Sequence, residues 1–199
     1  MKSVLQLSST PVTAAVDREM QHAERISDLF RDFSVALPKE TVVIRDEALA
    51  RRTTLRVGGP ADLLVEPSSE DALATVVELC ALRSVPWVVL GRGSNLLIRD
   101  GGIRGVVVSL AHAHFSRIEV QEDRLVVGAG ARLKTLAIEA RRLGLSGFEF
   151  LEGIPGSLGG ALRMNAGAMG SWMFDVVERV RCMDSRGNRL DLPVQEIEV

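Results

Sequence analysis

Apolar residues recur along the chain with two different periods, which predicts a mixture of strands and helices. Short β-branched or apolar runs bounded by turn residues predict strands. These runs lie at 41–45, 54–57, 61–65, 86–90 and 106–110. The second run stops at Gly58-Gly59-Pro60 and the third begins directly after it, which indicates a hairpin. From 70 to 83 the apolar side chains recur at helical spacing, and Ser68 and Ser69 can cap such a helix.

The second half of the chain repeats this mixture of elements. One hairpin is predicted at 118–130 with its turn at Glu122-Asp123, and another at 176–192 with its turn at 184–188. Between them, 133–143 has a helical pattern that ends at Gly144. We therefore expect two lobes of mixed α and β structure, joined near 111–117. The predicted division is an N-terminal extension with a helix at 1–40, a first subdomain at 41–110 and a second subdomain at 111–199.

The N-terminal extension carries apolar residues near helical spacing at 13–33, with acidic residues between them. This acidity argues against a mitochondrial presequence, and the first residues are too polar for the core of a signal peptide. No apolar run approaches the length of a membrane span. We expect a surface helix packed on the first subdomain or a loose N-terminal arm, in a protein that has no membrane partner.

Composition is that of an ordinary globular protein. Hydrophobic residues make up 46% and charged residues 25% of the 199 residues, which excludes disorder of the whole chain. The net charge of −2 leaves no basic surplus, which argues against nucleic acid as a partner. Cys80 and Cys182 lie far apart among apolar neighbours, and we interpret both as buried thiols in a reducing compartment. A cytoplasmic location is therefore predicted.

Glycine is concentrated in two short windows, and this is the main functional signal. Of the 18 glycines, five lie between Gly91 and Gly105 and eight between Gly144 and Gly170. Glycine lets backbone N–H groups turn toward an anion and lets a ligand approach the main chain closely. The first window opens with Gly91-Arg92-Gly93-Ser94-Asn95, directly after the predicted strand 86–90, where ligands bind in open α/β sheets. Because Leu96 replaces the third glycine of a dinucleotide fingerprint, either a phosphate-binding loop or a plain turn fits this spacing.

The second window contains Gly153-Ile154-Pro155-Gly156-Ser157-Leu158-Gly159-Gly160 and continues through Asn165 and Gly167. A Walker A loop would have Lys and then Ser or Thr after its second glycine, but Gly160 and Ala161 follow here. This difference disfavours hydrolysis of nucleoside triphosphates. Two interpretations stay open: a ligand approaches the main chain closely, or elements of the fold cross tightly inside the core.

Other chemistries have weaker support in the sequence. His22, His112 and His114 share no spacing with cysteines or carboxylates that would predict a metal site, so we predict none. Ser94 and Ser157 lack the GxSxG setting of a hydrolase nucleophile.

Three segments, taken in order, carry a family resemblance. They are TTLRVGGPADLLVEP at 53–67, VLGRGSNLLIRDGGIRGVVVSL at 89–110 and GFEFLEGIPGSLGGALRMNAGAMG at 147–170. Together they closely resemble the UDP-N-acetylenolpyruvoylglucosamine reductases, flavoenzymes of peptidoglycan precursor synthesis, over residues 41–199. The resemblance implies an α+β fold, namely an FAD-binding domain of the vanillyl-alcohol-oxidase (PCMH) type, in which two α+β subdomains grip the cofactor. This architecture agrees with the two lobes expected above.

The resemblance also implies which residues hold non-covalent FAD. In the family, the loop matching Gly91–Asn95 wraps the FAD pyrophosphate, and the loop matching Gly153–Gly160 passes the pyrophosphate, the ribityl chain and the flavin ring. The segment matching Asn165–Gly170 lies near the isoalloxazine, and Arg56 sits in a strand close to the cofactor. The implied cofactor-binding residues are Arg56, Gly91, Arg92, Gly93, Ser94, Asn95, Gly153, Ile154, Pro155, Gly156, Gly159, Gly160, Asn165 and Gly167.

The activity implied by the resemblance is that of a cytoplasmic oxidoreductase with NADPH as reductant. It reduces UDP-N-acetylglucosamine enolpyruvate to UDP-N-acetylmuramate for cell-wall synthesis, and so serves cell shape and division. The family's catalytic Arg, Ser and Glu are expected beyond Val199, so the chain is expected to be a truncated product or a fragment. Met169 stands where an aromatic Tyr is common in the family.

Two alternatives remain beside this function. The first is a noncatalytic FAD-binding module that kept the loops and lost the chemistry. The second is an oxidase-type relative with covalently bound flavin, which is disfavoured because neither glycine loop contains His or Cys.

Overall fold

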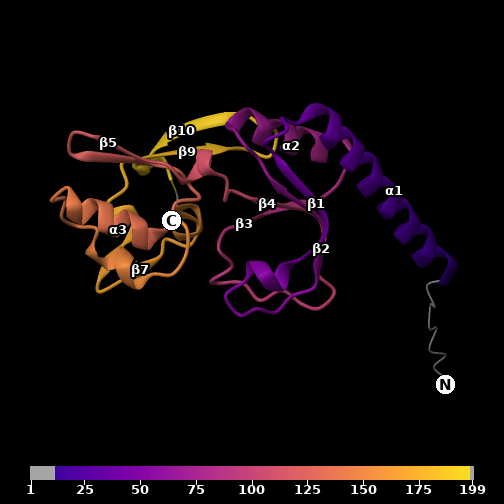
Figure 1. Cartoon of the computed structure of the whole chain (residues 1–199), viewed down its shortest axis with the longest axis horizontal. Helices are drawn as coiled ribbons and strands as arrows, with labels where there is room; N and C mark the ends of the chain where they lie inside the picture. Colours follow the sequence, from indigo (N-terminus) through magenta and orange to yellow (C-terminus); the bar gives the residue numbers. More distant parts are fainter. Residues whose placement is uncertain (1–11, 198–199) are drawn as a thin grey trace, which may run out of the picture.

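The first half of the chain folds around a four-stranded sheet. The computed structural model describes residues 12–197, and Figure 1 shows the arrangement. The strands are β1 (Val42–Ala48), β2 (Pro60–Glu66), β3 (Trp87–Leu90) and β4 (Ile103–Ser109), in the spatial order β1-β2-β4-β3. β1 runs antiparallel to β2, whereas β2, β4 and β3 are parallel to one another. The sheet is therefore mixed, with β1 and β3 at its edges.

Two helices, α1 (Val12–Ala36) and α2 (Glu70–Leu82), lie on the same side of this sheet (Figure 1). The side chain of Ser69 caps α2 by accepting a hydrogen bond from the Ala72 N–H at 3.1 Å, as its sequence predicts. The helices bury their apolar stripes against the sheet in one cluster. Its fully enclosed members are Leu29 and Phe33 from α1, Val76 and Cys80 from α2, and Leu63, Val65, Val106 and Val108 from the strands.

The opposite face of the sheet is covered by loops rather than helices. Leu49, from the 3₁₀ helix η1 (Leu49–Arg52), and Ile98, from the segment after β3, pack there with Leu64 and Val107. The glycine loop that follows β3 therefore lies on the face that the helices leave open.

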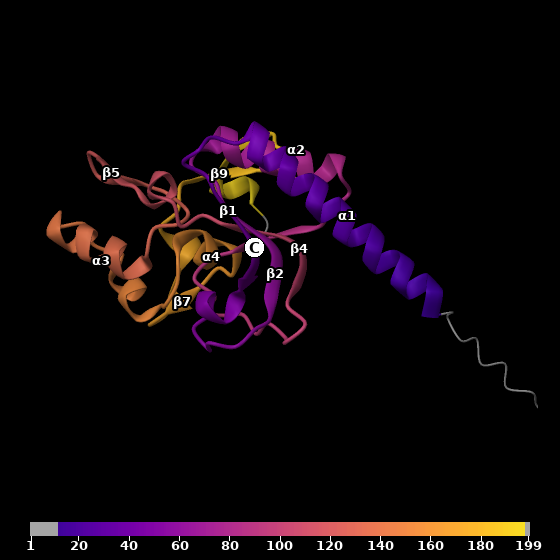
Figure 2. The same cartoon turned by 45° about the vertical axis from the view of Figure 1, so that its right-hand side comes forward.

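The second half of the chain has shorter elements around a third apolar cluster. The elements are η2 (Ala113–Ser116), the hairpin β5 (Ile118–Gln121) with β6 (Arg124–Val127), α3 (Leu133–Arg142), η3 (Glu149–Gly153), α4 (Leu158–Arg163), the short pair β7 (Gly167–Ala168) with β8 (Ser171–Trp172), η4 (Met173–Asp175), the hairpin β9 (Arg179–Met183) with β10 (Arg189–Pro193), and η5 (Val194–Glu196). Leu133, Leu136, Phe150, Leu151 and Met173 form the centre of this cluster. In both views α3, β5 and β7 lie at the opposite end of the molecule from α1 (Figure 1 and Figure 2).

The hairpin of β9 and β10 connects the two halves of the chain through ion pairs with α2. Arg189 of β10 forms ion pairs with Asp71 and, at 3.6 Å, with Glu70 in the first turn of α2. Figure 1 shows this hairpin, in yellow, reaching back to α2.

Most elements predicted from the sequence are confirmed. The strands predicted at 41–45, 61–65, 86–90 and 106–110, the helices at 13–33, 70–83 and 133–143, and both hairpins are present at or within a few residues of these bounds. Residues 1–11 of the N-terminal extension lie outside the described residues. The division into subdomains at 40 and 110 stays a prediction.

The strand predicted at 54–57 is wrong, and so is its hairpin with 61–65. These residues form a turn in which Thr53 Oγ1 donates to the Val57 carbonyl oxygen at 2.9 Å, and Arg56 adopts a left-handed φ of 55°. Such a backbone cannot continue a strand, so β2 pairs with β1 instead. Cys80 is buried as predicted, whereas Cys182 is exposed because it lies on the two-stranded β9–β10 hairpin, outside the three apolar clusters.

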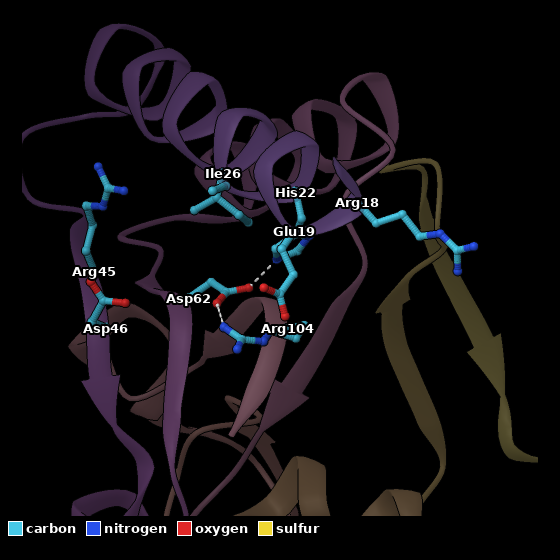
Figure 3. Close-up of a pocket in the computed structure, with 9 residues that line it drawn as sticks. Arg18, Glu19, His22, Ile26, Arg45, Asp46, Asp62 and Arg104 are labelled. Atoms are coloured by element: carbon cyan, nitrogen blue, oxygen red, sulfur yellow. Dashed lines mark hydrogen bonds and ion pairs between the residues drawn. The ribbon is translucent and has the colours of Figure 1, made fainter. Parts of the chain in front are cut away.

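A polar cluster fastens α1 to the sheet across an open pocket of about 520 Å³ (Figure 3). His22 Nε2 lies 2.6 Å from Asp62 Oδ2, the Gly105 N–H donates to the same oxygen at 2.7 Å, and Arg104 donates to Asp62 Oδ1 at 3.0 Å. Burial would raise the pKa of Asp62, but these three partners together hold it below the ordinary value of 3.8. The ionised Asp62 carboxylate therefore links α1 to β4.

None of the helices within residues 12–197 is long and apolar enough to cross a membrane.

We expect Asp62→Asn to lower the free energy of unfolding by about 2 kcal/mol near neutral pH, because it removes a carboxylate with three hydrogen-bond partners. The pKa of Asp62 is lower in the folded state than its ordinary value of 3.8, so the stabilisation is fully present above pH 3.8. It is lost as the pH falls through the pKa of Asp62 in the folded state. The difference between variant and parent should therefore narrow below pH 3.8 in urea titrations. Asp46→Asn, at an exposed position in the same pocket, is the control, and a difference that stays constant to low pH would contradict the assignment.

Candidate functional site

The two glycine loops predicted to bind a ligand lie against each other. Ser94 Oγ, in the loop after β3, donates a hydrogen bond to the Pro155 carbonyl oxygen at 3.0 Å, across 61 positions of sequence. A Cβ placed on Gly91 would lie 2.8 Å from Ser157 Oγ, and a Cβ on Gly156 would lie 3.3 Å from Ser94 Oγ. The structure therefore joins both loops into one feature, which we call the double-glycine cradle (residues 91–95 and 153–160).

The first loop of the cradle packs against residues 52–54, at the end of η1. Thr54 N–H donates to the Gly93 carbonyl oxygen at 3.1 Å. Gly93 has a φ of 60°, and a Cβ on it would lie 2.5 Å from the Arg52 carbonyl oxygen. Only glycine allows this backbone conformation and this approach at once. The side chains of Arg92 and Asn95, by contrast, are exposed.

The second loop of the cradle is held along the segment between β6 and α3. Leu158 N–H donates to the Ala131 carbonyl oxygen at 2.9 Å, and Gly159 N–H donates to that of Ala129 at 2.8 Å. A Cβ on Gly159 would lie 3.0 Å from the Ala129 Cβ. Ser157 is only 4% exposed, and its hydroxyl does not cap α4. This loop therefore has a fixed main-chain path.

Gly91 and Gly156 face the serine hydroxyl of the opposite loop, and the other four glycines of the cradle divide into two groups. Main chain or core side chains crowd the first group, Gly93 and Gly159, and the indole ring of Trp172 crowds Gly167 at 2.4 Å from a Cβ position. The second group is open, because a Cβ on Gly153 would meet nothing within 4 Å and one on Gly160 would meet only Ser157 Oγ at 3.6 Å. Tight crossing of elements explains Gly93 and Gly159, whereas space is left beside Gly153 and Gly160.

Of the remaining predicted residues, Ile154 belongs to the second loop of the cradle, whereas Asn165 and Arg56 lie outside both loops. Ile154 is half-buried against the third apolar cluster. Asn165 accepts a hydrogen bond from the Phe174 N–H at 3.3 Å, and Met169 has a φ of 55° with a side chain that is 85% exposed. Within residues 12–197, no hydrogen bond or ion pair joins Asn165 or Arg56 to either loop.

The strand placement implied for Arg56 is wrong, since Arg56 lies in the turn after η1 with an exposed side chain. Its left-handed backbone conformation, together with the hydrogen bond from Thr53 to Val57, excludes a strand there.

Two segments that support the cradle, 52–54 and 129–133, were not predicted from the sequence as part of the site. The second had a visible signal, the run Gly128-Ala129-Gly130-Ala131 before α3. Its purpose is close packing, because a Cβ on Gly130 would lie 1.9 Å from the Leu110 carbonyl oxygen. The first had no comparable local signal, since its contact with Gly93 spans 40 residues.

The chemistry offered by the cradle suits an anion. Neither loop contains an acidic residue, and the polar groups present are backbone N–H groups, the hydroxyls of Ser94 and Ser157, the amide of Asn95 and the guanidinium of Arg92. Backbone N–H groups on a glycine-rich turn form concave sites for phosphates and other anions. Within the described part of the chain, no group of three or more His, Cys, Asp or Glu side chains gathers where it could hold a metal ion.

The chain matches a described class of domain. The sequence profile of the FAD binding domain family matches residues 61–192, which is more than half of the chain. The chain belongs to the FAD binding domain family. This membership confirms the α+β, FAD-binding fold class that the three motifs predict.

Curated relatives confirm the resemblance to the reductases. The chain is 44% identical to UDP-N-acetylenolpyruvoylglucosamine reductase of Clostridioides difficile (strain 630) over 171 residues, which are 86% of this chain and 56% of the relative. It is 48% identical to the protein of the same name from Geobacter sulfurreducens over 145 residues, or 73% of this chain and 48% of the relative. The chain thus spans about half the length of the curated relatives that it matches.

Solved structures agree with this assignment. The UDP-N-acetylenolpyruvylglucosamine reductase from Thermus caldophilus aligns with a TM-score of 0.64 and 36% identity over 78% of this chain and 53% of that one. Phl p 4.0202, a glucose dehydrogenase, aligns with a TM-score of 0.62 over 83% of this chain and 38% of that one, but with 14% identity. The second match shows the shared fold of the FAD binding domain alone.

We expect Gly159→Val to lower the free energy of unfolding by roughly 2 kcal/mol, because the new side chain overpacks the contact with Ala129. Gly160→Val, one position further along α4, is the matched control and should cost less than about 1 kcal/mol, since its surroundings are open. Both variants add a β-branched residue to the same helix, so their difference isolates the contact. Equal losses in denaturant unfolding would contradict the division of glycines made above.

Proposed function

We propose that this chain forms the FAD-binding part of a UDP-N-acetylenolpyruvoylglucosamine reductase. The observation that carries the proposal is the double-glycine cradle, closed by the hydrogen bond between Ser94 and Pro155, in a chain 44% identical to such a reductase. The whole enzyme would use NADPH to reduce UDP-N-acetylglucosamine enolpyruvate to UDP-N-acetylmuramate. A UDP-sugar is accordingly its substrate and FAD its cofactor.

The residues of the cradle fit the pyrophosphate of FAD. The Ser94 hydroxyl and the N–H groups of Ile154, Leu158 and Gly159 donate within the protein, so the other N–H groups and the Ser157 hydroxyl are the donors for a ligand, and no carboxylate of either loop opposes them. The open positions at Gly153 and Gly160 leave space beside the main chain. The exposed guanidinium of Arg92 adds a positive charge that pairs well with phosphate oxygens. Residues 91–95 and 153–160 would therefore hold the cofactor through its phosphates.

When bound, FAD would supply the hydride chemistry between NADPH and the enolpyruvyl double bond. The contribution of this chain is binding and orientation. Hydrogen bonds along 129–133 and from Thr54 fix both loops, so their donors are preorganised before a ligand arrives. Neither loop contains His or Cys, which supports non-covalent binding of the cofactor.

Several wider roles follow from this proposal. A reductase of peptidoglycan precursors acts on a nucleotide-activated sugar in the cytoplasm, and its product supports cell-wall growth, cell shape and division. The two free cysteines of the chain agree with a reducing compartment.

The first test is the visible absorption spectrum of the purified 199-residue chain, with added FAD and then with NADPH under anaerobic conditions. We expect a protein-bound flavin spectrum that bleaches when NADPH is added. A colourless chain that takes up no FAD would overturn the proposal. A bound flavin that stays oxidised would favour the noncatalytic FAD-binding module instead.

Ser94→Ala should weaken FAD binding by about 1 kcal/mol, or roughly fivefold in Kd, because the hydrogen bond that ties the two loops is lost. Ser185→Ala, at an exposed position in the turn between β9 and β10, is the control and should leave Kd unchanged. Flavin fluorescence titration measures both values. Equal affinities for the parent and Ser94→Ala would show that the contact between the loops does not shape the site.

A further inference from the structure

An enclosed ion-pair cluster lies on the face of the sheet that carries the cradle. Arg52 of η1 donates from Nε to Glu47 Oε1 at 2.8 Å and from Nη1 to Glu66 Oε1 at 2.6 Å. The three side chains are 29%, 15% and 17% exposed, respectively. Burial lowers the pKa of Arg52, but the two carboxylates outweigh it and raise the pKa above its usual value. The guanidinium therefore stays charged and bound to both strands.

The main chain of the same residue forms the wall behind the first loop of the cradle. The Arg52 carbonyl oxygen and the Thr53 Cα lie 2.5 and 2.7 Å from the Cβ position of Gly93. Thr54 N–H then donates to the Gly93 carbonyl oxygen at 3.1 Å. A small displacement of residues 52–54 must therefore displace Gly93 as well, because no space separates them.

Arg52 and Thr53 are the last anchored side chains before an exposed stretch, because Thr53 is buried and its hydroxyl donates to the Val57 carbonyl oxygen. Leu49 is fully buried, whereas residues 54–57 are all exposed. Glu47 lies on β1 and Glu66 is the last residue of β2, so the two ion pairs fix η1 to both strands of this antiparallel pair. The position of the wall thus depends on a side chain that is bonded to β1 and β2 rather than to either loop of the cradle.

We propose that Arg52 is a positioning residue for the FAD site. By binding Glu47 and Glu66, it sets the path of residues 52–54 and through them the shape of the loop 91–95, without touching the cofactor. Lysine is a poor substitute, because a single ammonium cannot reproduce the planar fork that serves two carboxylates in different directions. The inference rests on the proposed function, since it concerns affinity for FAD.

The test compares Arg52→Lys and Arg52→Gln in the 199-residue chain, with Arg51→Gln as the control. Arg51 is an exposed neighbour on the same 3₁₀ helix and has no ion pair within the described residues. Two quantities are measured: the Kd for FAD by flavin fluorescence, and the free energy of unfolding without FAD. We expect Kd to rise about tenfold in Arg52→Gln, in line with loss of charge-assisted hydrogen bonds, and less in Arg52→Lys. The control should keep the parent Kd.

A purely structural role would lower the stability of the cofactor-free chain while the Kd of the folded molecules stayed at the parent value, and that result would overturn the inference. If Arg52→Gln does not fold, Glu66→Gln removes one ion pair only and should still raise Kd severalfold. An unchanged Kd in Glu66→Gln would also overturn it. Failure of the parent chain to bind FAD would instead overturn the proposed function, so the two failures are distinguishable.

Discussion

Direct contact between main-chain segments is the constraint on which the candidate site depends. Gly93 touches the backbone of Arg52 and Thr53 so closely that a Cβ would clash, and Gly159 lies so close to Ala129 that a Cβ would fit only if Ala129 shifted slightly. Side chains contribute one bond between the loops, from Ser94 to Pro155. A site built this way is rigid, because backbone segments packed without space between them have few alternative arrangements. It also presents N–H donors to a ligand at little further cost in conformational entropy.

The elements that could be predicted from the sequence are those whose shape is decided locally. The apolar stripe of α2 and its Ser69 cap lie within one segment, so the pattern contains the whole signal. The turn at 54–57 is different. Its residues favour a strand, but its conformation depends on the hydrogen bond from Thr53 to Val57 and on the one from Thr54 to Gly93, 39 positions later. Tertiary contacts overrode local propensity there, and a sequence pattern contains no record of such contacts.

The same distinction between local signals and distant contacts decides how much of the candidate site could be predicted. Clustered glycines predicted both loops, and their resemblance to the reductases predicted that they share one ligand. The pattern left the first loop as a phosphate-binding loop or a plain turn, and the second as a place of ligand approach or of tight crossing. In the structure the glycines of these loops differ in their surroundings. Gly93 and Gly159 are explained by packing, whereas Gly153 and Gly160 border open space. Sequence alone could not separate these groups, because the partners that crowd a glycine lie 30 to 41 positions away.

Strand β2 carries two polar clusters, each of which fixes a different element to the sheet. Asp62 fastens α1 on the helix-covered face, and Glu66 holds Arg52 on the face that carries the cradle. The strand between them is fully enclosed, with Leu63, Leu64 and Val65 buried in separate apolar clusters on the two sides. Loss of the first cluster should therefore loosen a helix without moving the cradle, whereas loss of the second should move the cradle while the helices stay packed. Alternation along the strand places Glu66 on the face of Leu64, opposite Leu63 and Val65. Strict alternation would put Asp62 on that face as well, but the register of β2 against β4 shifts between Ala61 and Leu63, and Asp62 contacts α1 on the helix-covered face.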